Sequence, residues 1–158
     1  MTFSSVWLPT VAAVLLGGLI GIERQMSGHS AGLRTHMLVS LASAMFVLAC
    51  RELTTPLPVD LTRVVQGIAA GVGFIGAGTI LKADRKHEVF GLTTASTIWL
   101  SAAIGTACGL DEYPLAITST LLTLVVLVVL RPIESRLLKQ RKQGQGNTDP
   151  NSDVTLLK

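Results

Sequence analysis

Residues that can hold a charged ligand gather at the ends of two apolar segments of this chain. Glu23 and Arg24 close the first segment, and Arg34, Thr35 and His36 open the second. A carboxylate at such a position attracts a cation, whereas arginine and the free N–H groups of a helix amino terminus attract an anion. The alternative is that these charged side chains extend into water and form solvated pairs of little energetic value.

Other kinds of chemistry find less support in the residue pattern. Gly71-x-Gly73-x-x-Gly76 matches a dinucleotide-binding fingerprint, but that motif works between a strand and a helix, and here apolar residues flank it on both sides. No His or Cys pair has the helical spacing of a zinc site. We therefore expect no enzymatic activity, no cofactor and no bound metal.

The stretch from Gln66 to Leu81 contains five glycines and no charged residue. Each glycine inside a soluble helix costs roughly 1 kcal/mol relative to alanine. In a bilayer, small residues instead let helix backbones approach closely. This stretch predicts a membrane helix that packs tightly.

The composition extends this interpretation to most of the chain. Of 158 residues, 49% are hydrophobic and 15% are charged, which is too apolar for an ordinary soluble domain. The charge-free stretches predict an all-α membrane protein with five transmembrane helices, at about residues 5–22, 35–50, 64–81, 91–110 and 113–130. The second is short for a span, so we expect local thinning of the bilayer or shielding by neighbouring helices.

The basic residues predict an orientation. With five spans, eleven Lys and Arg residues fall in the first loop, the third loop and the tail, and only Arg51 and Arg63 fall on the other side. The positive-inside rule then places the amino terminus outside and the carboxyl terminus in the cytoplasm. We expect a membrane domain over residues 1–132 and a basic, then polar, disordered tail over 133–158. The tail is better suited to anionic lipid than to nucleic acid.

This topology brings the ends of four predicted spans to one face of the membrane. The candidate polar cluster at that face consists of Glu23, Arg24, Arg34, Thr35, His36, Thr79, Thr93 and Thr94. We expect Arg34 to pair with Glu23 or to cap nearby carbonyls. On the opposite face, Cys50 and Cys108 are either bridged or, more commonly for buried cysteines, free thiols.

Glycines at a spacing of four residues recur in three of the predicted spans. The candidate helix-packing residues are Gly17, Gly21, Gly67, Gly71, Gly73, Gly76, Gly78, Gly105 and Gly109. Such pairs place two small residues on one helix face. They serve packing within one subunit or form the seam of a homodimer, and we expect a homodimer that uses span one or span three.

Four motifs together resemble the MgtC/SapB family of bacterial inner-membrane proteins. They are Gly17–Gln25 (GGLIGIERQ), Ala31–His36 (AGLRTH), Gly71–Ile80 (GVGFIGAGTI) and Gly91–Trp99 (GLTTASTIW). The resemblance implies a plasma-membrane protein tied to magnesium limitation. For virulence-associated members, the resemblance also implies a role in survival inside macrophages. In those members the implied partner is ATP synthase, whose activity they restrain.

Two departures limit what the resemblance implies. Virulence-associated members have Gly-Leu-Asn-Thr and Trp-Cys where this chain has Gly91-Leu-Thr-Thr94 and Trp99-Leu100. They also carry a cytoplasmic regulatory domain for which the tail of this chain is too short. We therefore expect a regulatory or accessory role in magnesium homeostasis. The alternative is a transporter of magnesium or another small solute, which the lack of an ionisable residue in mid-membrane disfavours.

Overall fold

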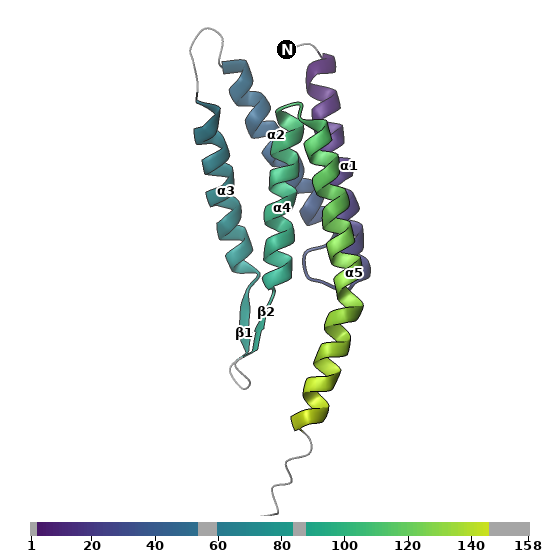
Figure 1. The fold of residues 1–158 in the computed structure, drawn as a ribbon. Coiled ribbons are helices and arrows are strands. Elements are labelled where there is room, and N and C mark those ends of the chain that lie inside the picture. Colours follow the sequence, from purple (N-terminus) through teal and green to yellow (C-terminus); the bar gives the residue numbers. More distant parts are fainter. Residues whose placement is uncertain (1–2, 54–59, 84–87, 146–158) are drawn as a thin grey trace, which may run out of the picture. The chain divides into compact units, whose positions relative to one another are not determined.

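The computed structural model describes the chain apart from residues 1–2, 54–59, 84–87 and 146–158. Its elements are α1 (Phe3–Met26), α2 (Leu33–Leu53), α3 (Leu61–Gly78), β1 (Leu81–Ala83), β2 (Glu88–Phe90), α4 (Leu92–Gly109) and α5 (Tyr113–Gln145). The fold is thus helical, as expected, with one addition. The two short strands pair antiparallel, with Leu81 opposite Phe90, and form a hairpin between α3 and α4 (Figure 1).

The hairpin is a small addition to the helical fold that the sequence predicted. Gly91 follows β2 directly and has φ 92°, a left-handed conformation that glycine adopts without steric cost. A Cβ at this position would overlap the carbonyl of Thr79. The chain therefore returns from the hairpin into α4 right beside the end of α3. Charged residues between spans had suggested only a loop there, because three-residue strands carry almost no periodic signal.

Among the described residues, four helices are long and apolar enough to cross a membrane. They are Ser5–Met26, Leu33–Arg51, Leu61–Gly78 and Tyr113–Leu130. The fourth expected span, at about residues 91–110, corresponds to α4, which is rich in Thr, Ser and Gly and is not among these four. The structure thus supports a multi-pass membrane protein by helix length and composition.

Helix α2 is longer than its charge-free stretch. It covers 21 residues, roughly 31 Å at 1.5 Å per residue, which matches a hydrocarbon core of about 30 Å. Arg34 and Arg51 lie inside the helix at its two ends, where long side chains can reach the interface. Neither thinning of the bilayer nor shielding by neighbours is needed for this helix to span.

Helix α5 corrects the expected boundary of the tail. It continues as helix to Gln145, although residues from 133 onward were expected to be disordered. Leu, Lys, Arg, Gln and Glu dominate the sequence of this stretch, and all of them favour helix intrinsically. The remainder of the tail, 146–158, lies outside the described residues. By contacts the chain divides into two units, Met1–Leu124 and Val125–Lys158.

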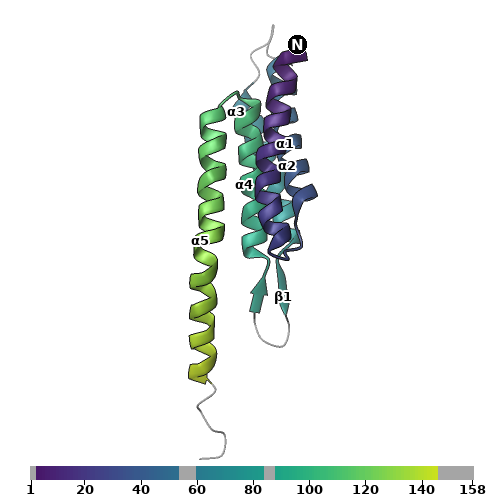
Figure 2. The same cartoon turned by 90° about the vertical axis from the view of Figure 1, so that its right-hand side faces the viewer.

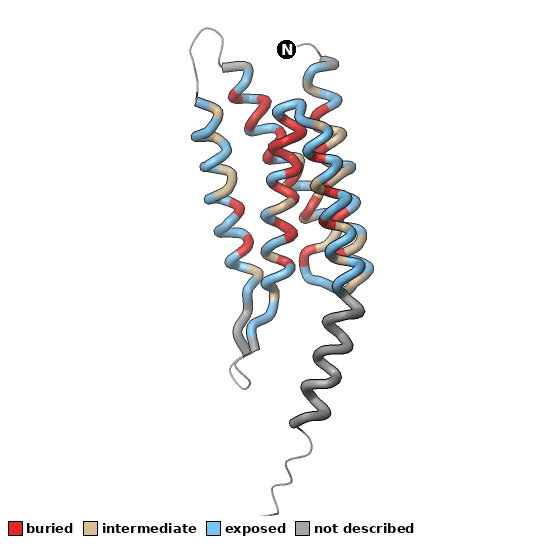
Figure 3. The backbone as a smooth tube through the Cα atoms, in the orientation of Figure 1, coloured by how far each residue is buried: buried red, intermediate tan, exposed pale blue. Residues whose placement is uncertain are grey.

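Within the first unit, α4 is the central helix. It packs against α1, α2 and α3 (Figures 1 and 2). Burial is concentrated along α4 and the sides of α1 and α2 that meet it, as Figure 3 shows. Helix α3 instead has only two buried residues, Val72 and Gly76. The candidate site lies where α1 ends, α2 begins and α4 begins.

Candidate functional site

A turn between α1 and α2 holds two helix ends of the site together. Gly28 has φ 75°, and the His29 amide donates a hydrogen bond to the Arg24 carbonyl at 3.1 Å, which ends α1. The side chain of Gln25 then reaches forward, and its Oε1 accepts a hydrogen bond from the Leu33 amide at 3.2 Å. The side chains of Arg24 and His36 are thereby held near each other.

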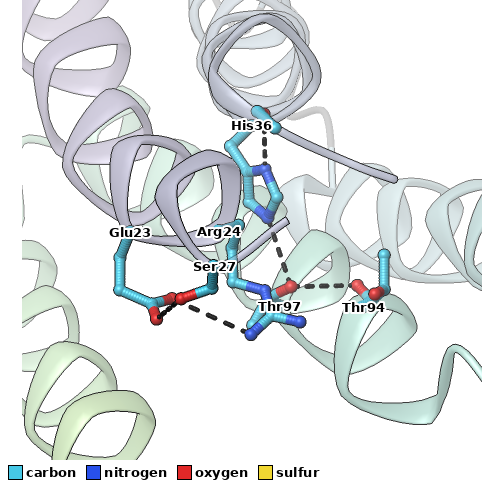
Figure 4. Close-up of polar contacts among 7 residues, drawn as sticks. Glu23, Arg24, Ser27, His36, Thr94 and Thr97 are labelled. Carbon is cyan, nitrogen blue, oxygen red and sulfur yellow. Dashed lines mark hydrogen bonds and ion pairs between the residues drawn. The ribbon is translucent and has the colours of Figure 1, made fainter. Parts of the chain in front are cut away.

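Arg24 and His36 form the buried centre of the site. Arg24 is 3% exposed and His36 is fully buried. Figure 4 shows the imidazole of His36 pointing at Thr97, with the guanidinium of Arg24 in the same space. Thr94, which is also buried, lies one helical turn from Thr97 on α4. The site therefore combines a permanent cation, an imidazole and two hydroxyl groups.

His36 joins α2 to α4 through a series of hydrogen-bond contacts. Its Nδ1 lies 2.8 Å from the Gly32 carbonyl oxygen, and its Nε2 lies 3.2 Å from the hydroxyl of Thr97. That hydroxyl lies 3.0 Å from the Thr94 carbonyl oxygen. The link spans 61 residues of sequence, so only the folded chain brings these two motifs together.

Glu23 has partners other than the one expected. Its Oε1 accepts a hydrogen bond from the Ser27 hydroxyl at 2.7 Å, and its Oε2 lies 3.8 Å from Arg24 Nη1. Arg34 is exposed and forms no ion pair with Glu23. The predicted Arg34–Glu23 pair is wrong because Arg34 lies on the outer side of α2. The neighbouring Arg24 takes its place.

The other expected members of the cluster divide between the site and its surroundings. Thr94 is buried beside Thr97, whereas Thr93 is exposed and Thr35 is half-buried. Thr79 caps the end of α3, and its hydroxyl donates to the Gly76 carbonyl at 2.7 Å. The structure thus joins Glu23, Arg24, His36 and Thr94 in one site and leaves Arg34, Thr35, Thr79 and Thr93 outside its centre.

Two members of the site were missed from sequence, Ser27 and Thr97. Thr97 lies one turn beyond Thr93 and Thr94 on a helix rich in hydroxyl residues, so spacing alone offered no way to rank it above Ser96 or Ser101. Ser27 lies four residues after Glu23, a spacing at which helical side chains meet. That spacing was the available signal for Ser27.

The packing glycines behave in two different ways. A Cβ at Gly17 would lie 2.7 Å from Ser40 Cβ, one at Gly21 2.7 Å from Leu33 Cα, and one at Gly109 2.8 Å from Val47 Cβ. A Cβ at Gly105 would overlap the Ser40 carbonyl. These four glycines therefore serve contacts among α1, α2 and α4 within the subunit, which excludes the Gly17/Gly21 face of span one as a dimer seam.

The glycines of α3 are open by comparison. A Cβ at Gly67, Gly71, Gly73 or Gly78 would meet no atom within 4 Å, and only Gly76 contacts Ala95 of α4. An apolar groove of 630 Å³ lies between α2 and α3, with Gly67, Gly71 and Phe46 in its wall.

The Cys50 and Cys108 thiols are both buried and free, so the alternative of a disulfide is wrong.

No group of three His, Cys, Asp or Glu side chains with the geometry of a metal site occurs among the residues that the structure describes.

At the other end of the bundle, Arg51 Nη1 donates to the Gly109 carbonyl at 2.8 Å and to Asp111 at 2.6 Å. This contact ties the end of α2 to the end of α4.

Comparison with known proteins gives consistent results. The chain is 40% identical over 153 residues to the Escherichia coli K12 protein named "Putative magnesium transporter YhiD", covering 93% of this chain and 70% of that one. It is 42% identical over 130 residues to Protein MgtC of Salmonella typhimurium LT2, covering 82% of this chain and 54% of that protein. The chain thus spans about half the length of MgtC.

A third relative, Protein SrpB of Synechococcus elongatus, is 41% identical over 131 residues, which cover 73% of this chain and 69% of SrpB. No solved structure matches the chain. Residues 10–136 match the MgtC family. That range contains the whole buried site and all the packing glycines, and we conclude that this chain belongs to the MgtC family.

Proposed function

We propose that this chain is a non-enzymatic protein of the bacterial inner membrane with a regulatory or accessory role in magnesium homeostasis. Family membership and the name of the YhiD relative support the link to magnesium. The regulatory role rests on one structural observation, the close packing of α1, α2 and α4. This protein acts through contacts of its helices, with its own copies or with another membrane protein.

The close packing of these three helices argues against a passage between them. At Gly17, Gly21, Gly105 and Gly109 a single added carbon atom would collide with a neighbouring helix. An ion path needs space for an ion and for the groups that replace its water. The interior between α1, α2 and α4 is instead filled by close backbone contacts and by buried side chains such as Ile20, Ile104 and His36.

The membrane topology is part of the same proposal. Five spans, with α4 as the fourth, place the amino terminus outside and the basic residues of the tail in the cytoplasm. Cysteines introduced singly at Ser4 and Ser152, with Cys50 and Cys108 replaced, test this in intact cells with an impermeant thiol reagent. We expect position 4 to be labelled and position 152 to be protected. The reverse pattern would invert the topology.

A transporter is the second candidate function. The printed name of the YhiD relative favours it, and the groove between α2 and α3, which a second subunit could close, offers space for a passage, although its wall is apolar. Purified protein in proteoliposomes separates the two functions. Magnesium entry no faster than in empty vesicles, while the protein restores growth of a deletion strain in low magnesium, supports regulation. Entry above that of empty vesicles supports transport.

A further inference from the structure

His36 and Thr97 form a hydrogen-bonded chain that begins and ends on backbone carbonyl oxygens. In order, the contacts are Gly32 carbonyl to His36 Nδ1 at 2.8 Å, His36 Nε2 to the Thr97 hydroxyl at 3.2 Å, and that hydroxyl to the Thr94 carbonyl at 3.0 Å. A carbonyl oxygen only accepts. Each of the three contacts therefore needs a hydrogen that comes from His36 or Thr97.

Counting hydrogens shows that the neutral site is one proton short. A neutral imidazole supplies one N–H and threonine supplies one O–H, so two hydrogens serve three contacts. Because Nδ1 faces a carbonyl, the single imidazole hydrogen must lie on Nδ1, and the lone pair of Nε2 faces Thr97. The Thr97 hydroxyl then donates either to Nε2 or to the Thr94 carbonyl, but not to both.

We propose that His36 is a proton-binding site, in which Nε2 takes up a proton from bulk water and thereby completes the hydrogen-bonded chain from α2 to α4. In the charged form Nε2–H donates to the Thr97 hydroxyl, which is then free to donate to the Thr94 carbonyl. In the neutral form the hydroxyl turns toward Nε2 and its bond within α4 is lost. Proton uptake therefore reverses the direction of the bond between the two helices.

Burial and the charged groups around His36 set the balance between the two forms. Burial of the imidazole and the positive charge of Arg24 on α1 oppose protonation, whereas the Gly32 carbonyl and the carboxylate of Glu23 favour it. On α4, none of the residues from Leu92 to Ala107 has a side chain that titrates. On α3, the only charged residue is Arg63 at the far end, and on α2 itself Arg34 is exposed. Glu23, which also pairs with Arg24, is thus the acidic side chain that favours the charged form of His36.

Nitrogen NMR on the full-length chain in lipid nanodiscs tests the site directly. With His29 and His87 replaced by Gln and the remaining histidine labelled with ¹⁵N, only His36 contributes ring signals. At high pH we expect a protonated Nδ1 and a bare Nε2, and on acidification, within the pH range in which the protein stays folded, we expect Nε2 to gain a proton. A neutral form protonated on Nε2, or a ring that stays neutral throughout, would overturn the proposal.

Variants of Thr97 separate proton binding from a merely structural contact. Hydrogen bonds to charged groups are stronger than neutral ones, so Thr97→Val should weaken proton binding at His36 about fivefold. Thr97→Ser keeps the hydroxyl and should titrate as the parent does. Thr106→Val removes another buried α4 hydroxyl, one that donates to its own helix at 2.9 Å, and should leave the titration unchanged. Equal titration midpoints for Thr97→Val and Thr106→Val would contradict the proposed role of Thr97.

Discussion

Helices α3 and α4 contain the same small-residue spacing, yet its surroundings differ completely between them. On α4, Gly105 and Gly109 lie against the backbone of α2, and a Cβ at Gly105 would overlap the Ser40 carbonyl. On α3, a Cβ at Gly67 or Gly71 would meet nothing within 4 Å. One helix uses its glycines inside the subunit, and the other leaves them on the surface.

The difference shows what a glycine pair at this spacing indicates. It marks a helix face that permits close approach of another backbone, and it does not identify the helix that approaches. In the first unit of this chain, α1, α2 and α4 use such faces to form the core, and the buried polar site lies within that core. The open face of α3 remains available for a second copy, which we propose as the seam of a homodimer.

The largest effect should come from filling the contact between α4 and α2. Gly105→Leu places a large side chain where the Ser40 carbonyl already lies, and we expect a loss of about 3 kcal/mol or more in the free energy of unfolding. Thermal unfolding in mild detergent, followed by circular dichroism, measures it. The matched control is Gly67→Leu on α3, expected to change stability by less than about 0.5 kcal/mol. Similar losses in both variants would erase the contrast between the helices.

Removal of the buried guanidinium should have the next largest effect. Arg24→Ala leaves Glu23 without its ion-pair partner in a largely buried setting, and breaking such pairs costs about 3 kcal/mol. The exposed Arg34 provides the control, because Arg34→Ala should be nearly neutral. Thermal unfolding of the two purified variants measures and compares their stabilities. Equal stability would show that Arg24 is no more important to the core than a surface residue.

The open face of α3 should affect assembly rather than folding. We expect Gly71→Leu to leave the subunit folded, since a Cβ at this position would meet nothing within 4 Å, and to dissociate the proposed homodimer by blocking close approach. Light scattering coupled to size-exclusion chromatography in mild detergent measures the mass. The control Gly78→Leu lies on the same open helix, beyond the Gly67/Gly71 pair. A dimer that persists in Gly71→Leu would place the seam elsewhere.

The smallest effect should be at the start of α3. Asp60 caps this helix, and hydrogen bonds from the Thr62 hydroxyl and amide hold the pKa of Asp60 below its ordinary value. A lowered pKa in the folded state means that the stabilisation is present above the ordinary pKa and is lost as pH falls through the lowered one. Asp60→Ala should therefore increase hydrogen exchange in the first turn of α3 at neutral pH. Unchanged exchange there, at pH 7, would contradict a role for the cap.

Sequence by itself determined the class of the protein and the position of most helices. Charge-free apolar stretches separated by basic residues allow little besides membrane helices, because a bilayer requires about 20 apolar residues per crossing. The motifs around Glu23, Thr94 and Gly71 also led to the MgtC family, which the comparisons confirmed. The gathering of Glu23, Arg24, His36 and Thr94 followed from topology, since helix ends at one membrane face must lie near one another.

Only the tertiary structure decided which residues of the polar cluster, and which of the packing glycines, contact other helices. Adjacent residues on a helix point about 100° apart, so whether Arg24 or Arg34 turns inward depends on the rotation of each helix against its neighbours. The same rotation buries Gly105 and exposes Gly71. The contact between His36 and Thr97 joins residues 61 positions apart, and only the packing of α2 on α4 brings them within hydrogen-bond distance.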